Sequence, residues 1–201
     1  MKDARRDRVL CEGVGGMVAK ILDGTRVAAR IRGEAGQIVR DVMARKGHPK
    51  LAGVLVGSAP AAKAYAASQQ KQCELVGIDY QLCELPDCTT AKNLTARLGE
   101  LNADPTVTGI IVQLPLPEGI DPAKVQLCID PYKDVEGVNP VNIGMVFEGE
   151  PIIAPCTALA VMALVRESGV QIEGAEAVVV GHSRIVGKPV ALMLVNELAT
   201  V

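Results

Sequence analysis

The chain has 201 residues, 49% of them hydrophobic, and no tryptophan, so it can bury an aliphatic core in one large or two small domains. The formal net charge is −2, and interspersed acidic and basic residues leave no basic tract or aromatic platform for nucleic acid. No apolar run is long enough to span a membrane, and six cysteines without a CxxC pair or zinc-like spacing favour a metal-free cytoplasmic protein with reduced thiols.

The N-terminal segment, residues 1–16, is predicted to be a disordered extension. No apolar stretch follows its arginines, which excludes a secretory signal peptide, and its acidic residues argue against a transit peptide. Met17 is a second candidate for the start of the protein. After Asp23-Gly24, residues 25–47 have apolar side chains at helical spacing and predict an amphipathic helix that Pro49 ends.

Strands and helices are predicted to alternate through the next part of the chain. Continuous apolar runs closed by Gly or Pro predict buried parallel strands, and helically spaced runs predict the helices between them. In chain order we expect a strand at 51–57, a helix at 60–76, a strand at 79–86, a helix capped by Thr89-Thr90 and running to Ala103, a strand at 109–116 and a helix at 121–129. This alternation implies right-handed crossovers and a mostly parallel sheet.

Residues 137–156 are rich in Gly, Pro and Asn, and we interpret them as a connection between domains. The predicted boundary gives a first domain over 17–156 and a second over 157–201. In the second domain we expect a helix capped by Thr157 and closed by Gly169, a strand at 175–181, a turn, a helix through 190–199 and the first residues of a next strand at Thr200-Val201. One strand and one helix cannot form a parallel sheet, so the chain is either a fragment or carries a vestigial second unit.

The segment VVVGHSRIVGKP lies where a dinucleotide-binding turn belongs, between a strand and a helix. Gly181 allows a tight turn, Pro189 suits the first helical turn, and the N–H groups at the helix start can receive a pyrophosphate. The spacing differs from GxGxxG, so the pattern alone is equally consistent with an ordinary turn.

Two other segments carry candidate ligand-binding side chains. Gln113 follows an apolar strand at its carboxyl end, where ligands bind in open α/β sheets. In isolation, this position slightly favours a glutamine that simply faces solvent. The loop KDVEG places Asp134 and Glu136 together, and Tyr65 could stack on a flat ligand or pack at a helix start.

The motifs TRVAARIR, VGSAPAAKAY, VQLPLP, KDVEGVNPVNIG, PCT and VVVGHSRIVGKP occur in this order. From about Lys20 to Val201 the chain closely resembles the FolD family of methylenetetrahydrofolate dehydrogenase/cyclohydrolases. The resemblance implies an α/β protein: a three-layer folate-binding domain, and the first strand, turn and helix of a Rossmann-like domain. It also implies one-carbon folate metabolism, in which 5,10-methylenetetrahydrofolate is oxidised with NADP and the methenyl product is hydrolysed to 10-formyltetrahydrofolate. Tetrahydrofolate derivatives are the expected ligands and a homodimer the expected assembly.

The resemblance also assigns roles to residues of the folate site. The family tyrosine that stacks on folate corresponds to Tyr65, and the catalytic lysine four residues later corresponds to Gln69. Lys71 lies two residues further, rotated by roughly 200° on a helix, and is expected to point away. Gln113 is the glutamine that works with that lysine, and the substrate-binding residues Val112 and Leu114 flank it. Glu136 replaces the aspartate that contacts the pterin, and it keeps the negative charge.

Since glutamine cannot take up a proton near neutral pH, the hydrolytic activity is expected to be weak or lost. The predicted catalytic residues are therefore Gln69, Gln113, Tyr65 and Glu136. The predicted cofactor-binding residues are Gly181, His182, Ser183, Ile185, Gly187 and Pro189. His182 replaces an arginine that favours NADP, which leaves NAD possible. The alternative function is a non-catalytic folate-binding or dimerisation module.

Overall fold

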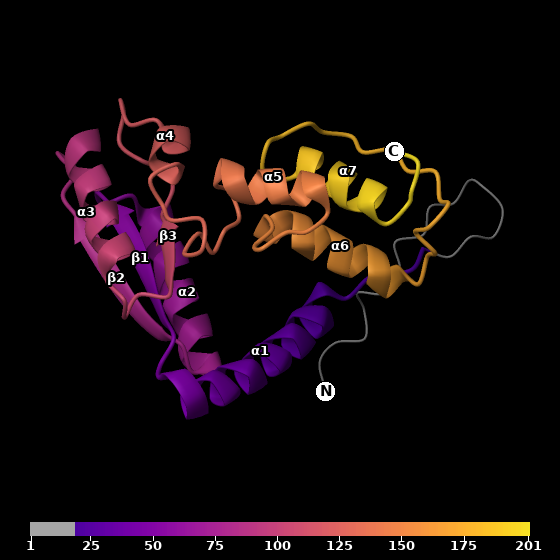
Figure 1. The fold of residues 1–201 in the computed structure, drawn as a ribbon, viewed down its shortest axis with the longest axis horizontal. Helices are drawn as coiled ribbons and strands as arrows, with labels where there is room; N and C mark the ends of the chain where they lie inside the picture. The colour runs from indigo at the N-terminus through magenta and orange to yellow at the C-terminus, as the bar shows by residue number, and fades with distance from the viewer. Residues whose placement is uncertain (1–18) are drawn as a thin grey trace, which may run out of the picture.

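A computed structural model describes residues 19–201, so the predicted extension at 1–16 and the candidate start Met17 lie outside the described residues. The elements in chain order are α1 (Gly24–Lys46), β1 (Lys50–Val56), α2 (Pro60–Val76), β2 (Asp79–Leu85), α3 (Ala91–Ala103), β3 (Gly109–Val112), α4 (Pro122–Gln126), α5 (Pro140–Glu148), α6 (Cys156–Ser168) and α7 (Gly187–Asn196). They form an α/β unit and a helical unit, and α1 contacts both (Figure 1).

The first unit is built on a parallel sheet with the strand order β2-β1-β3, as the alternating pattern predicted. Leu51 of β1 lies opposite Tyr80 on one side and opposite Gly109 on the other. All three strands therefore point their carboxyl ends to one edge. Gln113, which directly follows β3, lies at that edge.

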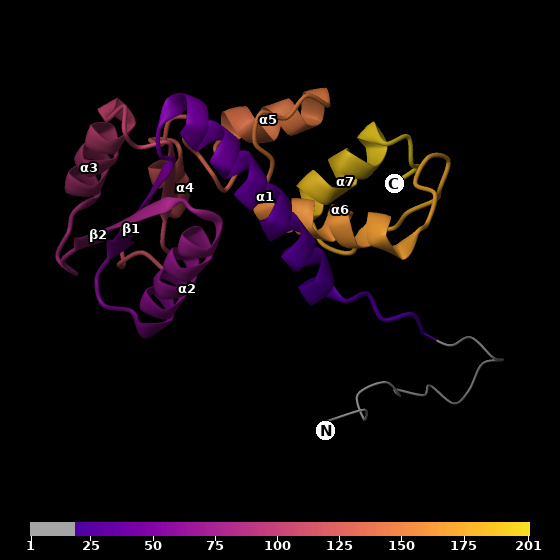
Figure 2. The ribbon, with the colours of Figure 1, turned by 90° about the horizontal axis from the view of Figure 1, so that it is seen from below.

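Helices cover both faces of this sheet, which gives the three layers expected from the resemblance. On one face, Val54 of β1 packs in a core cluster with Leu94 and Leu98 of α3. Leu55 points to the opposite face, where α2 contributes the buried Ala62 and Ala66. Figure 2 shows α2 and α3 on opposite sides of the strands. Because successive residues of β1 point to opposite, covered faces, every residue of the strand after Lys50 is apolar or glycine.

Capping groups set several helix boundaries in the first unit. Asp23 accepts hydrogen bonds from the N–H groups that start α1, and Thr90 caps α3 as predicted. The prediction that Pro49 ends α1 is wrong, because the helix ends at Lys46 and Gly47 follows with φ 91°. Glycine adopts this positive φ without the steric cost of a side chain, so the helix stops before the proline.

The predicted connection at 137–156 contains a helix, α5, which sequence reasoning missed. Asn139 caps it by accepting from the Val141 N–H at 2.9 Å, Pro140 is its first residue, and Gly149 ends it in a left-handed conformation. These are ordinary start and stop signals, but they flank only nine residues and suggested a loop. The domain boundary near 156 stays a prediction.

The helical unit packs α5, α6 and α7 around a second core cluster. Val146 of α5, Met162 of α6 and Leu194 of α7 are buried together there. The expectation that Thr157 caps α6 is wrong: the helix begins at Cys156, after Pro155, and Thr157 lies inside its first turn. Gly169 ends α6 with φ 82°, as predicted.

The predicted strand at 175–181 forms only one parallel bridge, between Glu176 and Thr200. Val178 and Val180 are 91% and 97% exposed, because no neighbouring strand of the described chain pairs with them. Likewise β3 ends at Val112, four residues earlier than predicted, since two prolines lie within the next five positions and cannot donate to a ladder.

None of the described helices combines the length and apolar character that crossing a membrane requires.

Candidate active site

Helix α2 carries Tyr65 and Gln69 four residues apart, which is about one helical turn. Pro60 starts this alanine-rich helix and Gly77 ends it in a left-handed conformation. Tyr65 is 59% exposed, so its ring is free to meet a flat ligand. Lys71 is exposed, while the Gln69 side chain is partly buried and bonded within the site.

Gln113 is buried, with only 2% of its surface exposed, so it does not face solvent. Its main-chain N–H donates to Val54 O at 2.8 Å, which extends the pairing with β1 by one residue. Its side-chain Nε2 donates to Gln69 Oε1 at 2.6 Å. The structure therefore joins the two glutamines that the sequence assigned to one site from positions 44 residues apart.

Val112 and Leu114, the predicted substrate-binding residues on either side of Gln113, differ in their exposure. The Val112 side chain is in the core cluster with Leu94 and Leu98, so only its main chain is left for a ligand. Leu114, next along the chain after Gln113, is 48% exposed and offers an apolar side chain to a ligand.

The KDVEG loop runs along β3 in the same direction as the strand. A parallel bridge joins Asp134 to Ile110, and the Ile110 N–H donates to Lys133 O at 2.7 Å. Lys133 Nζ donates to the carbonyl oxygens of Leu101, Asn102 and Asp104 at the end of α3, which fixes the start of the loop. From there the chain leads toward Glu136.

Asp134, which the sequence placed in an ordinary charged loop, is 1% exposed. Its Oδ2 accepts from the Asn139 N–H at 2.7 Å and from Asn142 Nδ2 at 2.9 Å. Oδ1 has no hydrogen-bond partner in the described structure. Asp134 is therefore a buried anchor that ties the loop to α5.

Glu136 is partly buried beside this anchor. Burial raises the pKa of the Glu136 carboxyl from its ordinary value of 4.5 to about 7, and the Asp134 carboxylate adds to the shift by like-charge repulsion. The carboxyl therefore holds its proton closer to neutral pH than an ordinary glutamate does, which changes the expectation that position 136 simply keeps its charge. A group in this state can donate or accept a proton.

Tyr80 of β2 is a member of this site that sequence reasoning missed. Its hydroxyl donates to Gln69 Oε1 at 3.3 Å. No pattern marked it, because Tyr80 lies near the start of its strand, far from the carboxyl edge where ligands were expected. The signal that could have found it is Gly53 in the neighbouring strand, which leaves room for a large side chain.

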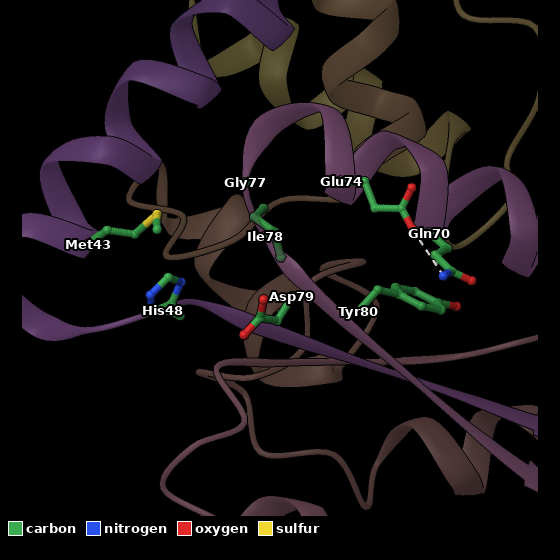
Figure 3. Close-up of a pocket in the computed structure, with 8 residues that line it drawn as sticks. All are labelled: Met43, His48, Gln70, Glu74, Gly77, Ile78, Asp79 and Tyr80. Carbon is green, nitrogen blue, oxygen red and sulfur yellow. Dashed lines mark hydrogen bonds between the residues drawn. The ribbon is translucent and has the colours of Figure 1, made fainter.

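The Tyr80 ring also lines a pocket of about 390 Å³. The pocket lies between the end of α1, the second half of α2 and the start of β2, as Figure 3 shows with Met43, His48, Gln70, Glu74, Gly77, Ile78, Asp79 and Tyr80. This is the amino edge of the sheet, whereas Gln113 lies at the carboxyl edge. The pocket therefore does not coincide with the predicted folate site around Gln69 and Gln113.

The predicted dinucleotide turn forms a second pocket of about 360 Å³, lined in part by Gly181, His182, Gly187 and Lys188. A Cβ at position 187 would overlap the Gly181 carbonyl oxygen, so glycine is required where the helix passes the turn. Gly181 itself has φ 135°. Both glycines therefore serve the backbone geometry that the sequence predicted.

The N–H groups at the start of α7 are already used, contrary to the expectation that they are open to a pyrophosphate. The Gly187 N–H donates to Ser183 Oγ at 3.3 Å and the Lys188 N–H to Ser183 O at 3.1 Å, and Pro189 has none. Pro189 is buried, and Ile185 is 39% exposed. Arg184 Nη2, in the same turn, donates to Gln126 Oε1 of α4 at 2.6 Å.

Within residues 19–201, no group of three or more His, Cys, Asp or Glu side chains could hold a metal ion. The candidate site brings together the side-chain amides of Gln69 and Gln113 and the phenol of Tyr80.

Comparison with known proteins matches both units of the chain to family models. Residues 22–136 match the catalytic domain of tetrahydrofolate dehydrogenase/cyclohydrolase, and residues 155–201 match the NAD(P)-binding domain of the same enzymes. The bifunctional protein FolD of Geotalea uraniireducens is 45% identical over 184 residues, which are 92% of this chain and 66% of that protein. The chain thus spans just under two thirds of the length of this relative.

Solved structures agree with these matches. The bifunctional enzyme FolD from Campylobacter jejuni superposes with a TM-score of 0.86 at 38% identity, covering 90% of this chain and 64% of the other. The Trypanosoma brucei enzyme, solved with NADP cofactor and inhibitor, gives a TM-score of 0.83 at 38% identity and covers 90% and 63% of the two chains.

Proposed function

Because this chain belongs to the tetrahydrofolate dehydrogenase/cyclohydrolase family, we propose that the protein oxidises 5,10-methylenetetrahydrofolate to the 5,10-methenyl form with NADP. We further propose that its hydrolysis of the methenyl product to 10-formyltetrahydrofolate is weak or lost. The observation that carries the proposal is the 2.6 Å hydrogen bond between Gln113 and Gln69, which unites the two positions expected to handle the one-carbon unit.

The folate ligand would be held from several elements. The exposed Tyr65 ring offers a stacking surface, and Leu114 adds apolar contact. Glu136, with its pKa of about 7, can hydrogen-bond a pterin edge as either donor or acceptor. These contacts fix the orientation of the ligand, which is the main requirement for hydride transfer.

A neutral residue at position 69 is compatible with the positive charge that the oxidation creates on the ligand. Bound NADP supplies the hydride acceptor. When the methylene bridge loses a hydride, the remaining methenyl bridge carries a positive charge. Gln69 does not repel this charge, and the ionised fraction of Glu136 favours it. Gln69 and Gln113 thus position the ligand without taking part in proton transfer.

Hydrolysis places a different demand on the same residues. Water that attacks the methenyl carbon must lose a proton, and a glutamine amide cannot accept one near neutral pH. General base catalysis typically contributes about 10²- to 10⁴-fold to such a step. The absence of a basic side chain at position 69 therefore supports a loss of this order in the hydrolytic rate.

The cofactor site would use the exposed face of the turn. Since the first N–H groups of α7 are bonded to Ser183, the phosphates would meet His182 and Lys188, which line the second pocket. Lys188 provides a fixed positive charge for a phosphate group. A homodimer in the cytoplasm is part of the same proposal and rests on the family resemblance.

Paired assays of the full protein would test the proposal, one for NADP-dependent formation of the methenyl product and one for its hydrolysis. We expect the wild type to carry out the first far faster than the second, and Gln69→Lys to raise hydrolysis by at least about 100-fold. Gln72→Lys is the matched control, because it adds the same charge at an exposed position of α2. A wild type that hydrolyses the methenyl form as fast as it makes it would refute the assignment to Gln69. Folate binding without NADP-dependent turnover would support the non-catalytic alternative instead.

A further inference from the structure

The Tyr80 hydroxyl completes the hydrogen bonding of the Gln69 side-chain oxygen. This oxygen accepts from Gln113 Nε2 at 2.6 Å and from the Tyr80 hydroxyl at 3.3 Å. A carbonyl oxygen has two lone pairs, so these two donors saturate it. The plane of the Gln69 amide is therefore set by one bond from Tyr80 of β2 and one from Gln113, directly after β3, and its NH₂ group is left on the side away from both donors.

The Tyr80 phenol occupies space that is open because the neighbouring residue Gly53 has no side chain. A Cβ at position 53 would overlap the Tyr80 hydroxyl oxygen and lie 2.8 Å from the ring carbon Cζ, well inside van der Waals contact. Gly53 lies on β1, which pairs with the strand that carries Tyr80. The phenol occupies space that a side chain at position 53 would fill, so its contact with Gln69 depends on glycine at that position. The contact is therefore independently supported by the backbone.

We propose that Tyr80 is a positioning residue of this site: seated over Gly53, its hydroxyl holds Gln69 Oε1 so that the Gln69 NH₂ group faces the ligand. The inference rests on the proposed function, which supplies the ligand. Burial of Tyr80, followed by the influence of the Cys73 thiol, raises the pKa of the phenol, so the hydroxyl remains a neutral donor at physiological pH.

This arrangement selects the kind of group that Gln69 meets. With its oxygen saturated, the amide presents only N–H donors, so the partner on the ligand is an acceptor such as a carbonyl oxygen or a ring nitrogen. A freely rotating glutamine could present either end. Tyr80 thus makes position 69 a fixed, uncharged donor, which supports orientation for hydride transfer and supplies no base for hydrolysis.

Kinetics of Tyr80→Phe, Gln69→Leu and the double variant test the role in the full protein. Loss of one neutral hydrogen bond predicts a fall of about 3- to 10-fold in dehydrogenase kcat/KM for Tyr80→Phe, mainly in kcat. In the Gln69→Leu background, Tyr80→Phe should have no further effect, since Tyr80 acts through Gln69. Tyr132→Phe is the matched control, because Tyr132 is 73% exposed and outside the site, and its kinetics should equal those of the wild type.

A measurement without ligand separates this inference from the proposed function. In protein with ¹³C at tyrosine Cζ, we expect the Tyr80 resonance, assigned by its loss in Tyr80→Phe, to move in Gln69→Leu while the Tyr132 resonance does not. A wild type without dehydrogenase activity would overturn the proposed function. Additive kinetic effects of the two substitutions, or a Tyr80 resonance that Gln69→Leu leaves in place, would overturn the positioning role alone.

Discussion

Replacing Glu136 with glutamine should stabilise the protein above neutral pH. The wild-type carboxyl has a pKa raised to about 7 by burial and by Asp134, so the fold disfavours its ionised form. At about 1.4 kcal/mol per pKa unit, the difference from 4.5 is on the order of 3 kcal/mol, and solvent screening around the partly exposed carboxyl reduces this to about 2 kcal/mol. Glutamine keeps the size and removes the charge, so it avoids this cost.

The sign of the pH dependence follows from proton binding. Between about pH 4.5 and 7 the unfolded chain has released the Glu136 proton while the folded protein still holds it. Raising the pH through this window therefore favours the unfolded state, and the wild type should lose about 2 kcal/mol between pH 5 and 8 relative to Glu136→Gln. Above pH 7 the difference levels off.

Urea unfolding of both proteins at pH 5, 6, 7 and 8 measures this difference directly. Glu118→Gln is the control. Because the Glu118 side chain is exposed, this variant should unfold like the wild type at every pH. If Glu136→Gln gains no stability over the wild type between pH 5 and 8, then the carboxyl is not desolvated as described and its role as a near-neutral acid is wrong.

Two further predictions concern the cofactor turn and the neighbouring lysine. Gly187→Ala should weaken NADP binding by at least about 10-fold, because the new Cβ would lie 2.6 Å from the Gly181 carbonyl carbon and push the turn away from α7. Titration with NADP measures the change in affinity. Gly144→Ala is the control, because a Cβ at position 144 meets no atom within 4 Å. Lys71→Gln should leave the dehydrogenase and hydrolase rates unchanged, because Lys71 is exposed and rotated away from Gln69. Steady-state assays of both activities test this, and a loss of hydrolysis would show that Lys71 reaches the site.

The local elements of the first unit could be predicted from the sequence because local signals define them. The run at 60–76 is helical over its full predicted length, and Thr90 caps α3 as expected. One prediction failed because its outcome depended on residues far away in the sequence. The apolar run at 175–181 has strand character but lacks a paired neighbour in the described residues, so it forms a single bridge. Helix α5 was missed because its nine residues resemble a loop in composition.

The sequence by itself determined which chemical groups are present: a tyrosine, a glutamine four residues later, and a second glutamine after a buried strand. Spacing along α2 was enough to separate Gln69 from Lys71, since helical rotation is a local property. Only the tertiary structure decided that Gln113 is buried against Gln69, and that Tyr80 reaches the same oxygen across Gly53. These contacts join residues from α2, β1, β2 and the position directly after β3. Their geometry depends on strand order and on the packing of α2 over the sheet, which no local pattern encodes.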